Sequence, residues 1–314
     1  MRPWPGPLGP GATVALVAPA YALGPDVAEE AQAGLAALGL RVRPGRHLAS
    51  RDGPWAGTPA ERLADLTWAL TAPDVDGVWA ARGGAGTLAV AAALPWRRVA
   101  ARPRPVVGMS DITALHAGLA RWGIPSLHAP MPGGGAGGGW DAWAAGAALA
   151  ALSSPPPWTV PQPPDAPPPE AWAGGRAEGP VVGGNLTLLA ACAGTALEPP
   201  TRGAILFLEE VGEAAYRVDR ALTQLALAGM LSGVAGVAVG AFLRCPPSGG
   251  VDVEEVLRRH LLALGVPVLA RLPVGHGEAR APLPLGVRVR LDAERGELVV
   301  LEAAWRRPGG GAAA

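Results

Sequence analysis

Short apolar runs alternate with helical patterns over the first part of the chain, and this alternation restricts the possible folds more than any other feature. Residues 11–17, 75–81 and 105–109 are apolar runs of strand length. Residues 25–38 and 58–70, which lie between the first two runs, carry apolar side chains at helical spacing. Continuous apolar strands are buried on both faces, and parallel strands are joined by crossover helices. The sequence therefore predicts a parallel sheet covered by helices on both faces.

The chain changes character in its middle. Residues 133–139 are almost all glycine, and residues 155–169 are rich in proline, which excludes a regular helix or a central strand. Residues 204–208 and 234–242 then predict apolar strands, and residues 287–301 a terminal hairpin. We therefore expect an α/β protein with an N-terminal parallel-sheet layered domain and a smaller strand-rich C-terminal domain. The expected limits are an N-terminal α/β domain at 1–150, a Pro/Gly-rich linker at 151–175, a C-terminal α+β domain at 176–307 and a disordered tail at 308–314.

Composition argues against several classes of partner. The 26 basic and 26 acidic residues give a net charge of zero, whereas a nucleic-acid-binding protein carries a basic excess. No apolar run reaches the roughly 18 residues of a membrane helix. Pro19 interrupts the first apolar run, which argues against a signal peptide and predicts cytoplasmic residence. Cys192 and Cys245 lack metal-type spacing and are expected to be free thiols. The sequence has no His-Glu-x-x-His pattern and no cysteine cluster, so no metal is expected, and no cofactor is expected either.

The most informative local pattern is the sequence VVGMSD at residues 106–111. An apolar strand ends in Gly-x-Ser, and a helical pattern begins immediately afterwards. This arrangement presents the Ser110 hydroxyl at the carboxyl end of a parallel sheet, where such sheets bind ligands. It also places the amide of Asp111 at a helix N-terminus, as a donor for a developing oxyanion. The alternative is that Ser110 only caps the helix, since Ile112 replaces the second glycine of a Gly-x-Ser-x-Gly elbow.

A nucleophilic serine needs a base, and the chain contains five histidines. His276 lies between two glycines on an expected loop, a setting that packing explains poorly and that allows close approach of a ligand. His128 follows a short expected strand and is the second candidate. His47, His116 and His260 are expected to have other roles, because they lie on a strand edge or within helices.

Carboxylates and a glycine turn complete the set of candidates. Glu209 and Glu210 follow directly after the apolar strand at 204–208, and their side chains are expected to point to opposite faces. One of them could orient the histidine, although both could equally be solvated acids at a strand end. The glycine turn at residues 83–86 follows another strand. Its spacing does not fit a nucleotide site, so donation of backbone amides to an oxyanion is the simpler interpretation.

These pieces, in this order, resemble the LD-carboxypeptidase family of serine peptidases, which includes muramoyltetrapeptide carboxypeptidases and microcin-immunity proteins. The resemblance covers nearly the whole chain. It rests on GATVALVAP at 11–19, RLADL at 62–66, ARGGAG at 81–86, GMSDITALH at 108–116, HAPM at 128–131, GGNL at 183–186, ILFLEE at 205–210, YRVDR at 216–220 and PVGH at 273–276. Ala85 and Ala129 depart from the family, which commonly has tyrosine and glycine at these places.

The resemblance implies a Ser-Glu-His triad, which falls on Ser110, Glu209 and His276, with Glu210 as the alternate acid or a substrate-binding group. It further implies an oxyanion hole from the amides of Gly84 and Asp111. Bacterial members remove the terminal D-alanine from the murein tetrapeptide, during recycling in the cytoplasm, and are usually homodimers. Arg82 is a candidate, by position, for binding the substrate carboxylate.

Two other functions stay open at this point. A relative within the same family cleaves peptide or aminoacyl-nucleotide antibiotics and confers self-immunity, and the sequence does not separate it from the murein enzyme. A protein that binds a small peptide without catalysis is the third possibility. It would leave Ser110 resistant to a serine-directed fluorophosphonate.

Overall fold

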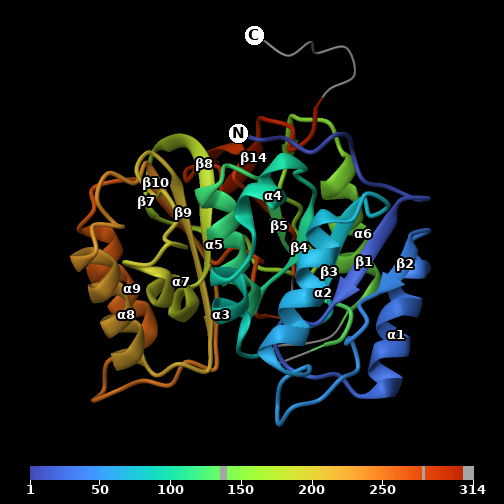
Figure 1. Cartoon of the computed structure of the whole chain (residues 1–314). Coiled ribbons are helices and arrows are strands. Elements are labelled where there is room, and N and C mark those ends of the chain that lie inside the picture. Colours follow the sequence, from blue (N-terminus) through green and yellow to red (C-terminus); the bar gives the residue numbers. More distant parts are fainter. Residues whose placement is uncertain (135–139, 278–279, 307–314) are drawn as a thin grey trace.

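The computed structural model describes residues 1–134, 140–277 and 280–306, which form two β-sheets surrounded by helices (Figure 1). The N-terminal sheet has the strand order β12-β5-β4-β3-β1-β2. Strands β1 to β5 run parallel, and β12 pairs antiparallel with β5. The strands are β1 (Thr13–Val17), β2 (Arg41–Pro44), β3 (Gly77–Ala80), β4 (Val106–Gly108), β5 (Ser126–His128) and β12 (Leu283–Leu285). The predicted N-terminal parallel sheet is confirmed.

Helices cover both faces of this sheet because neighbouring strand residues point in opposite directions. Leu16 of β1 packs in the same core as helices α1 and α6, whereas Val17 packs in the core that contains α2, α3, α4 and α5. A capping box, with Thr58 and Glu61 as its members, starts α2. The helices are α1 (Pro25–Ala36), α2 (Pro59–Thr71), α3 (Thr87–Ala92), α4 (Trp96–Ala101), α5 (Thr113–Arg121) and α6 (Ala142–Ser153).

The C-terminal sheet has the order β6-β14-β13-β8-β9-β10-β11-β7. Its central strands β8 to β11 are parallel, and antiparallel strands flank them on both sides. The strands are β6 (Trp158–Thr159), β7 (Glu170–Ala173), β8 (Arg176–Asn185), β9 (Ile205–Val211), β10 (Gly236–Leu243), β11 (Val268–Ala270), β13 (Arg288–Asp292) and β14 (Glu297–Val300). Strands β13 and β14 confirm the predicted terminal hairpin.

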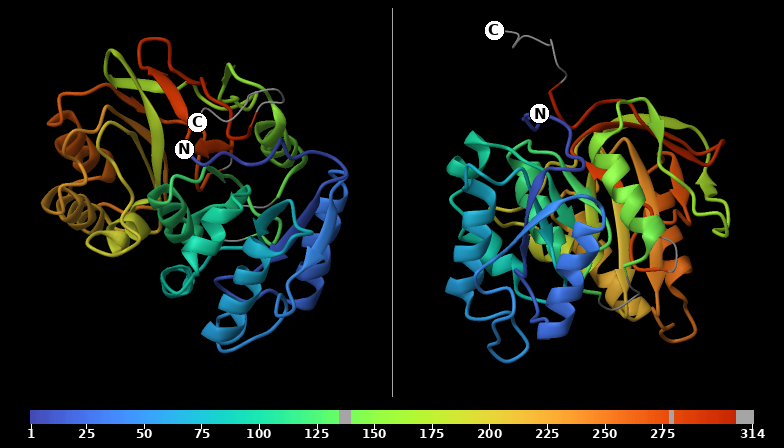
Figure 2. Two further views of the ribbon diagram at one scale, coloured as in Figure 1. Left: turned by 45° about the horizontal axis from the view of Figure 1, so that its top comes forward. Right: turned by 90° about the vertical axis from the view of Figure 1, so that its right-hand side faces the viewer.

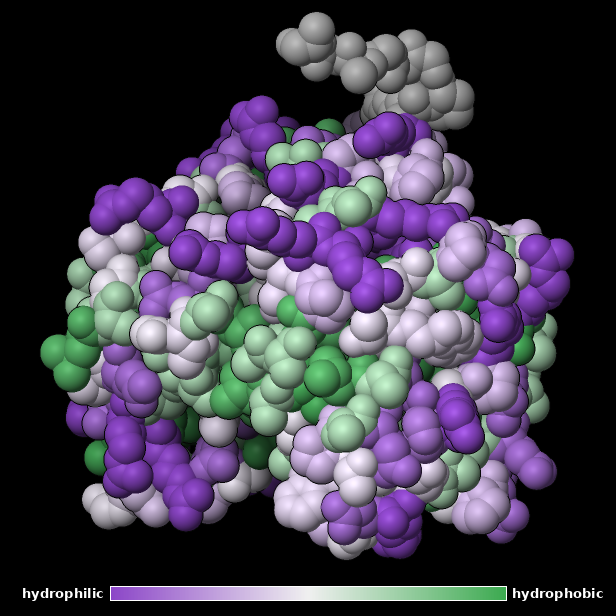
Figure 3. All heavy atoms as spheres, viewed as in Figure 1, coloured by the Kyte–Doolittle hydropathy of each residue, from purple (hydrophilic) through white to green (hydrophobic). Residues whose placement is uncertain are grey.

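The two sheets share one core. Helices α7 (Leu186–Cys192), α8 (Ala215–Leu227) and α9 (Val253–Leu262) cover one face of the C-terminal sheet. On its other face, Phe207 of β9 and Leu269 of β11 pack in one cluster with Val107 of β4 and Leu127 of β5. On the face seen in Figure 3, apolar side chains gather near the centre, around α3 and α5, and polar ones lie toward the edges.

Sheet membership crosses the expected domain limits. The segment expected as a linker, 151–175, contributes β6 and β7 to the C-terminal sheet, each as an edge strand, where proline-rich sequence is tolerated. Strand β12, from the expected C-terminal domain, joins the N-terminal sheet. Trp4 and Trp305 form a parallel bridge, so the two ends of the described chain lie together (Figure 2). The expected limits themselves stay a prediction.

Two sequence expectations lie mainly or wholly outside the described residues. They are the tail at 308–314 and most of the glycine tract at 133–139. Across the ranges that are described, no helix is both long enough and apolar enough to span a membrane.

Candidate active site

Ser110 lies at a sharp turn between β4 and α5. Its φ of 63° is in the left-handed region, which costs free energy for a residue with a side chain and commonly marks a functional turn. A short 3-10 helix, Ser110–Ile112, leads from this turn into α5. The side chain of Ser110 is partly exposed, whereas Asp111 and Ile112 are buried. This strand-turn-helix geometry is that of a nucleophile elbow, although the second glycine of the usual sequence is missing.

The glycine turn at 83–86 packs directly against the elbow. A Cβ atom added at Gly83 would lie 2.9 Å from the Cβ of Ser110 and 3.1 Å from its Oγ, so a side chain does not fit there. The carboxylate of Asp111 accepts a 2.8 Å hydrogen bond from the backbone amide of Thr87, at the start of α3. Gly84 has a φ of 127°, and a Cβ atom added there would clash with the side chain of Tyr21. The turn and the elbow are therefore fixed to each other.

Glu209 and His276 form a buried hydrogen-bonded pair. The Nδ1 atom of His276 lies 2.6 Å from Oε2 of Glu209, and the backbone amide of His276 donates to the same oxygen at 3.1 Å. Gly275 has a φ of 99°, and a Cβ there would lie 2.8 Å from the Cβ of Glu209. Glycine before the histidine is thus required for this close approach, as the sequence pattern suggested.

The electrostatics of the pair favour an ionised carboxylate. Burial by itself raises the pKa of Glu209, but the hydrogen bonds and charge of His276, with a smaller effect of His128, bring the pKa below its usual value. Because Nδ1 of His276 faces a carboxylate, it carries the ring proton, and Nε2 is left with a free lone pair. Such a ring can accept a proton from a hydroxyl.

A hydrogen bond between α5 and β8 links the carboxyl ends of the two sheets. The hydroxyl of Thr113, at the start of α5, accepts a 2.9 Å hydrogen bond from the amide of Asn185, which ends β8. Asn185 is the register partner of Glu209 across β8 and β9. Ser110 therefore lies on a turn that is anchored beside the end of β9. No hydrogen bond joins Ser110 to His276 among the described residues.

Glu210 has a different environment from Glu209. Its buried carboxylate accepts hydrogen bonds from Asn185 Nδ2 at 2.7 Å, from the amide and hydroxyl of Thr187 at 2.9 and 2.7 Å, and from the amide of Val211 at 2.8 Å. Burial raises its pKa. Glu210 thus holds the first turn of α7, and Glu209 is the acid that contacts the histidine. Opposite side-chain directions along β9 explain the division.

The arginine, the two outer histidines and the two cysteines singled out in the sequence lie at different places in the structure. Arg82 is half-buried and donates a 3.0 Å hydrogen bond to the carbonyl of Ala22. His47 contacts Asp65, and His260 contacts Asp219, both away from the elbow. Both cysteines are free thiols, as predicted, and burial raises the pKa of each.

Two buried histidines lie behind the elbow. His116 joins Gly108 and Ser126, with its Nε2 2.9 Å from the Gly108 carbonyl oxygen. His128 ends β5 opposite Gly108, and its Nε2 lies 4.0 Å from Oε1 of Glu209. From the sequence, His128 was the second candidate for the base, and His116 was expected to have another role. Their contacts join different strands, and in the case of His128 the two sheets, and no local sequence pattern predicts such contacts.

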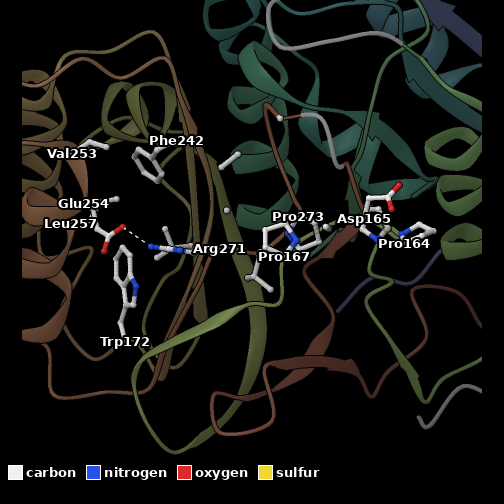
Figure 4. A pocket seen from close by; sticks show the side chains of 17 residues that line it. Pro164, Asp165, Pro167, Trp172, Phe242, Val253, Glu254, Leu257, Arg271 and Pro273 are labelled. Atoms are coloured by element: carbon white, nitrogen blue, oxygen red, sulfur yellow. Dashed lines mark hydrogen bonds and ion pairs between the residues drawn. The ribbon is translucent and has the colours of Figure 1, made fainter.

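A cavity of about 670 Å³ lies next to the His276 loop (Figure 4). Trp172 and Leu257 lie at one end and Pro164 at the other, with Arg271 and Pro273 between them. Its lining includes Gly277, the residue after His276, but neither Ser110 nor Glu209. The cavity therefore adjoins the His276 loop and is distinct from the elbow.

Comparison with known proteins places this chain in a family. The model of the LD-carboxypeptidase N-terminal domain matches residues 14–129, and that of the C-terminal domain matches residues 178–291. The murein tetrapeptide carboxypeptidase of Pseudomonas aeruginosa is 36% identical, over 90% of this chain and 94% of that protein.

Solved structures agree with the sequence comparison. The muramoyltetrapeptide carboxypeptidase of Oxalobacter formigenes superposes with a TM-score of 0.79 at 29% identity, covering 93% of this chain and 99% of that one. The microcin C7 self-immunity protein MccF, in complex with aspartyl sulfamoyl adenosine, gives a TM-score of 0.86 at 22% identity, covering 96% and 99%, and shows likeness of fold. From the family matches and the Pseudomonas relative, we conclude that the chain belongs to the LD-carboxypeptidase family.

Proposed function

We propose that this protein is a serine carboxypeptidase that hydrolyses an L,D-peptide bond and releases the terminal D-alanine of a murein tetrapeptide during cell-wall recycling. The observation that carries the proposal is the buried 2.6 Å contact between Glu209 and His276, in a chain that also holds Ser110 on a strained strand-to-helix elbow. The Pseudomonas relative, named as a murein tetrapeptide carboxypeptidase, supports the substrate class.

The reaction is an acyl transfer. His276 Nε2 removes the hydroxyl proton of Ser110 as Oγ bonds to the scissile carbonyl carbon. The resulting imidazolium is stabilised by the ionised Glu209 on its Nδ1 side. His276 then gives the proton to the amine of the leaving D-alanine, and the carbon–nitrogen bond breaks. Water, activated by the same ring, hydrolyses the acyl-enzyme and restores the serine.

We assign the oxyanion hole to the amides of Gly84 and Asp111. The Asp111 amide follows the nucleophile at the first turn of the 3-10 helix, where amides lack intrahelical partners. Gly84 is exposed and directly follows Gly83, the residue of the turn that packs against Ser110. Donors aimed at a developing negative charge account for much of the rate enhancement in acyl transfer. Neither amide needs to move far, because the turn is tied to Asp111 through Thr87.

Recognition of the free carboxylate is assigned to Arg82. Its guanidinium is held at the start of the glycine turn by the Ala22 carbonyl, and it retains further N–H groups that could bind a carboxylate. Replacement by methionine should raise KM for a tetrapeptide while changing kcat little, because the contact would be equal in the ground and transition states. Equal KM values for Arg82→Met and wild type would remove Arg82 from the substrate site.

The function is tested by incubating purified protein with L-Ala-D-γ-Glu-meso-diaminopimelate-D-Ala and measuring free D-alanine. We expect release by wild type and a loss of several orders of magnitude in Ser110→Ala. Ser232→Ala, a change at an exposed serine after α8, is the matched control and should keep full activity. Equal release by wild type and Ser110→Ala would contradict the assignment of the nucleophile.

Absence of release by folded wild type would contradict the murein substrate. Hydrolysis of aspartyl sulfamoyl adenosine by the same preparation would then identify an antibiotic-cleaving immunity enzyme. Failure of a fluorophosphonate to label Ser110 would favour a non-catalytic peptide-binding protein. The homodimer that the family resemblance implies is tested separately, by sedimentation over a range of protein concentrations.

A further inference from the structure

His128 presents an unusual buried contact on the far side of Glu209 from His276. The side chains of His128 and Glu209 are 1% and 0% exposed. Nε2 of His128 and Oε1 of Glu209 lie 4.0 Å apart, and within the described part of the chain neither atom has a hydrogen-bond partner. Buried polar atoms are nearly always paired, so two of them facing each other require an explanation.

The surroundings fix the position of the His128 ring. It packs edge-to-face against Phe207, with ring centroids 5.0 Å apart and an interplanar angle of 77°. The backbone of His128 pairs with Gly108 on β4 and with Leu283 on β12, so the residue is held between two strands. A ring held in this way cannot easily leave Glu209. The carboxylate therefore lies between two imidazoles, each associated with a different oxygen.

We propose that His128 is a positioning residue, which donates from Nε2–H to the second oxygen of Glu209 and so holds the carboxylate in line with His276. The inference rests on the proposed role of Glu209 and His276, and it adds a residue to that machinery. The 4.0 Å separation is longer than a hydrogen bond. Donation therefore requires the two atoms to approach by about 1 Å, and we expect this approach as charge develops on His276. Catalytic hydrogen bonds are often long in unliganded enzymes.

The charges around the pair are consistent with a neutral donor. The titratable groups that face His128 are Glu209 from β9, His276 from its loop and His116 from α5, whose ring centroid is 6.3 Å away. Burial is the main cause that lowers the pKa of His128, to about 4. The ring therefore stays uncharged at neutral pH. A neutral ring with its proton on Nε2 supplies a donor without adding a second cation beside His276.

The test compares His128→Phe with His128→Gln. Phenylalanine keeps a ring against Phe207 but has no donor, whereas the amide nitrogen of glutamine can reach the place of Nε2. We expect His128→Phe to lower kcat roughly 10- to 100-fold with little change in KM, as for loss of a hydrogen bond to a charged group. His128→Gln should recover most of the rate. His260→Gln, at a histidine paired with Asp219 on the surface, is the control and should behave as wild type.

The pH profile separates positioning from packing. Without the donor, the ionised form of Glu209 is less stabilised, so the pKa of its carboxyl rises. The acid limb of kcat/KM should therefore move upward, by about 0.5–1 pH unit, in His128→Phe and not in His128→Gln. A rate loss equal in both variants, with no shift of the acid limb, would assign His128 a packing role and overturn the proposal.

Two further measurements keep the proposal testable if a variant does not fold or the substrate is wrong. Nitrogen NMR of wild type labelled with ¹⁵N-histidine should show His128 protonated on Nε2 from about pH 5 to 8, and protonation on Nδ1 would refute donation to Glu209. Fluorophosphonate labelling reports on Ser110 without a murein peptide. Unlabelled wild type contradicts the proposed function, whereas equal labelling rates in wild type and His128→Phe contradict the role of His128.

Discussion

The substitution Gly83→Ala tests the geometry of the elbow with a single methyl group. The added Cβ would lie 2.9 Å from the Cβ of Ser110, whereas ordinary carbon contacts begin near 3.4 Å. The glycine turn or the serine must therefore move by about half an ångström. A misplacement of 1 Å at a reacting atom can cost about 100-fold in rate, so we expect kcat/KM to fall between roughly 10- and 100-fold. Overpacking should also cost about 1–3 kcal/mol of stability.

The assay measures D-alanine release together with urea unfolding, and Gly146→Ala is the matched control. Gly146 is exposed in the middle of α6, and an added Cβ there meets nothing within 4 Å. This control should keep its kcat/KM and gain about 0.5–1 kcal/mol of stability, as alanine usually does in a helix. If Gly83→Ala kept wild-type kcat/KM and labelled Ser110 at the wild-type rate, the close packing of turn and nucleophile would have no part in catalysis.

Three other changes follow from the same contacts. Glu209→Gln should lower kcat by roughly 10³- to 10⁴-fold, because the amide favours the wrong tautomer of His276 and cannot stabilise its imidazolium. Fixed-time or stopped-flow assays of D-alanine release would measure this loss. Stability should fall as the pH drops below 6.5, because burial lowers the pKa of His116 to about 3 and of His128 to about 4, so the unfolded chain binds more protons. The slope reaches about 1.4 kcal/mol per pH unit for each ring until the folded pKa, and urea midpoints between pH 7.5 and 4.5 measure it; a flat profile would contradict buried neutral rings. Thr113→Val should cost about 1–3 kcal/mol in urea unfolding, because it leaves the buried amide at the end of β8 without an acceptor, and an unchanged midpoint would refute that link.

The first sheet was predictable because its information is local. Continuous apolar strands, helical spacing between them and a capping box at Thr58 each depend on neighbours in the sequence. Strand β12 was not predictable, because a three-residue strand such as Leu283–Leu285 carries no signal for the sheet that it joins. The same holds for β7, since nothing before Glu170 specifies pairing with β11.

In the candidate site, too, the features with a local sequence pattern were predictable and the long-range contacts were not. A strand ending in Gly-x-Ser and a histidine between glycines are local patterns, and the structure places strained backbone at Ser110 and close approach at Gly275. The neighbouring sequence did not determine which of Glu209 and Glu210 contacts the histidine. Alternation along a strand predicts that the two carboxylates diverge, but not which one faces His276. That choice is set by Gly275, 66 positions beyond Glu209 in the sequence, which lets the histidine loop approach only the first acid.

The division of the site between two sheets limits how it can close. Ser110 belongs to a turn of the N-terminal sheet, Glu209 belongs to β9 of the C-terminal sheet, and His276 lies on the loop that joins β11 to β12. Because both sheets contribute to one buried core around Phe207, a hinge between them would expose apolar surface at about 25 cal/mol per Å². The hydrogen bond from Asn185 to Thr113 adds to that cost. We therefore expect His276 to approach Ser110 through adjustment of its own glycine-flanked loop, with the sheets fixed.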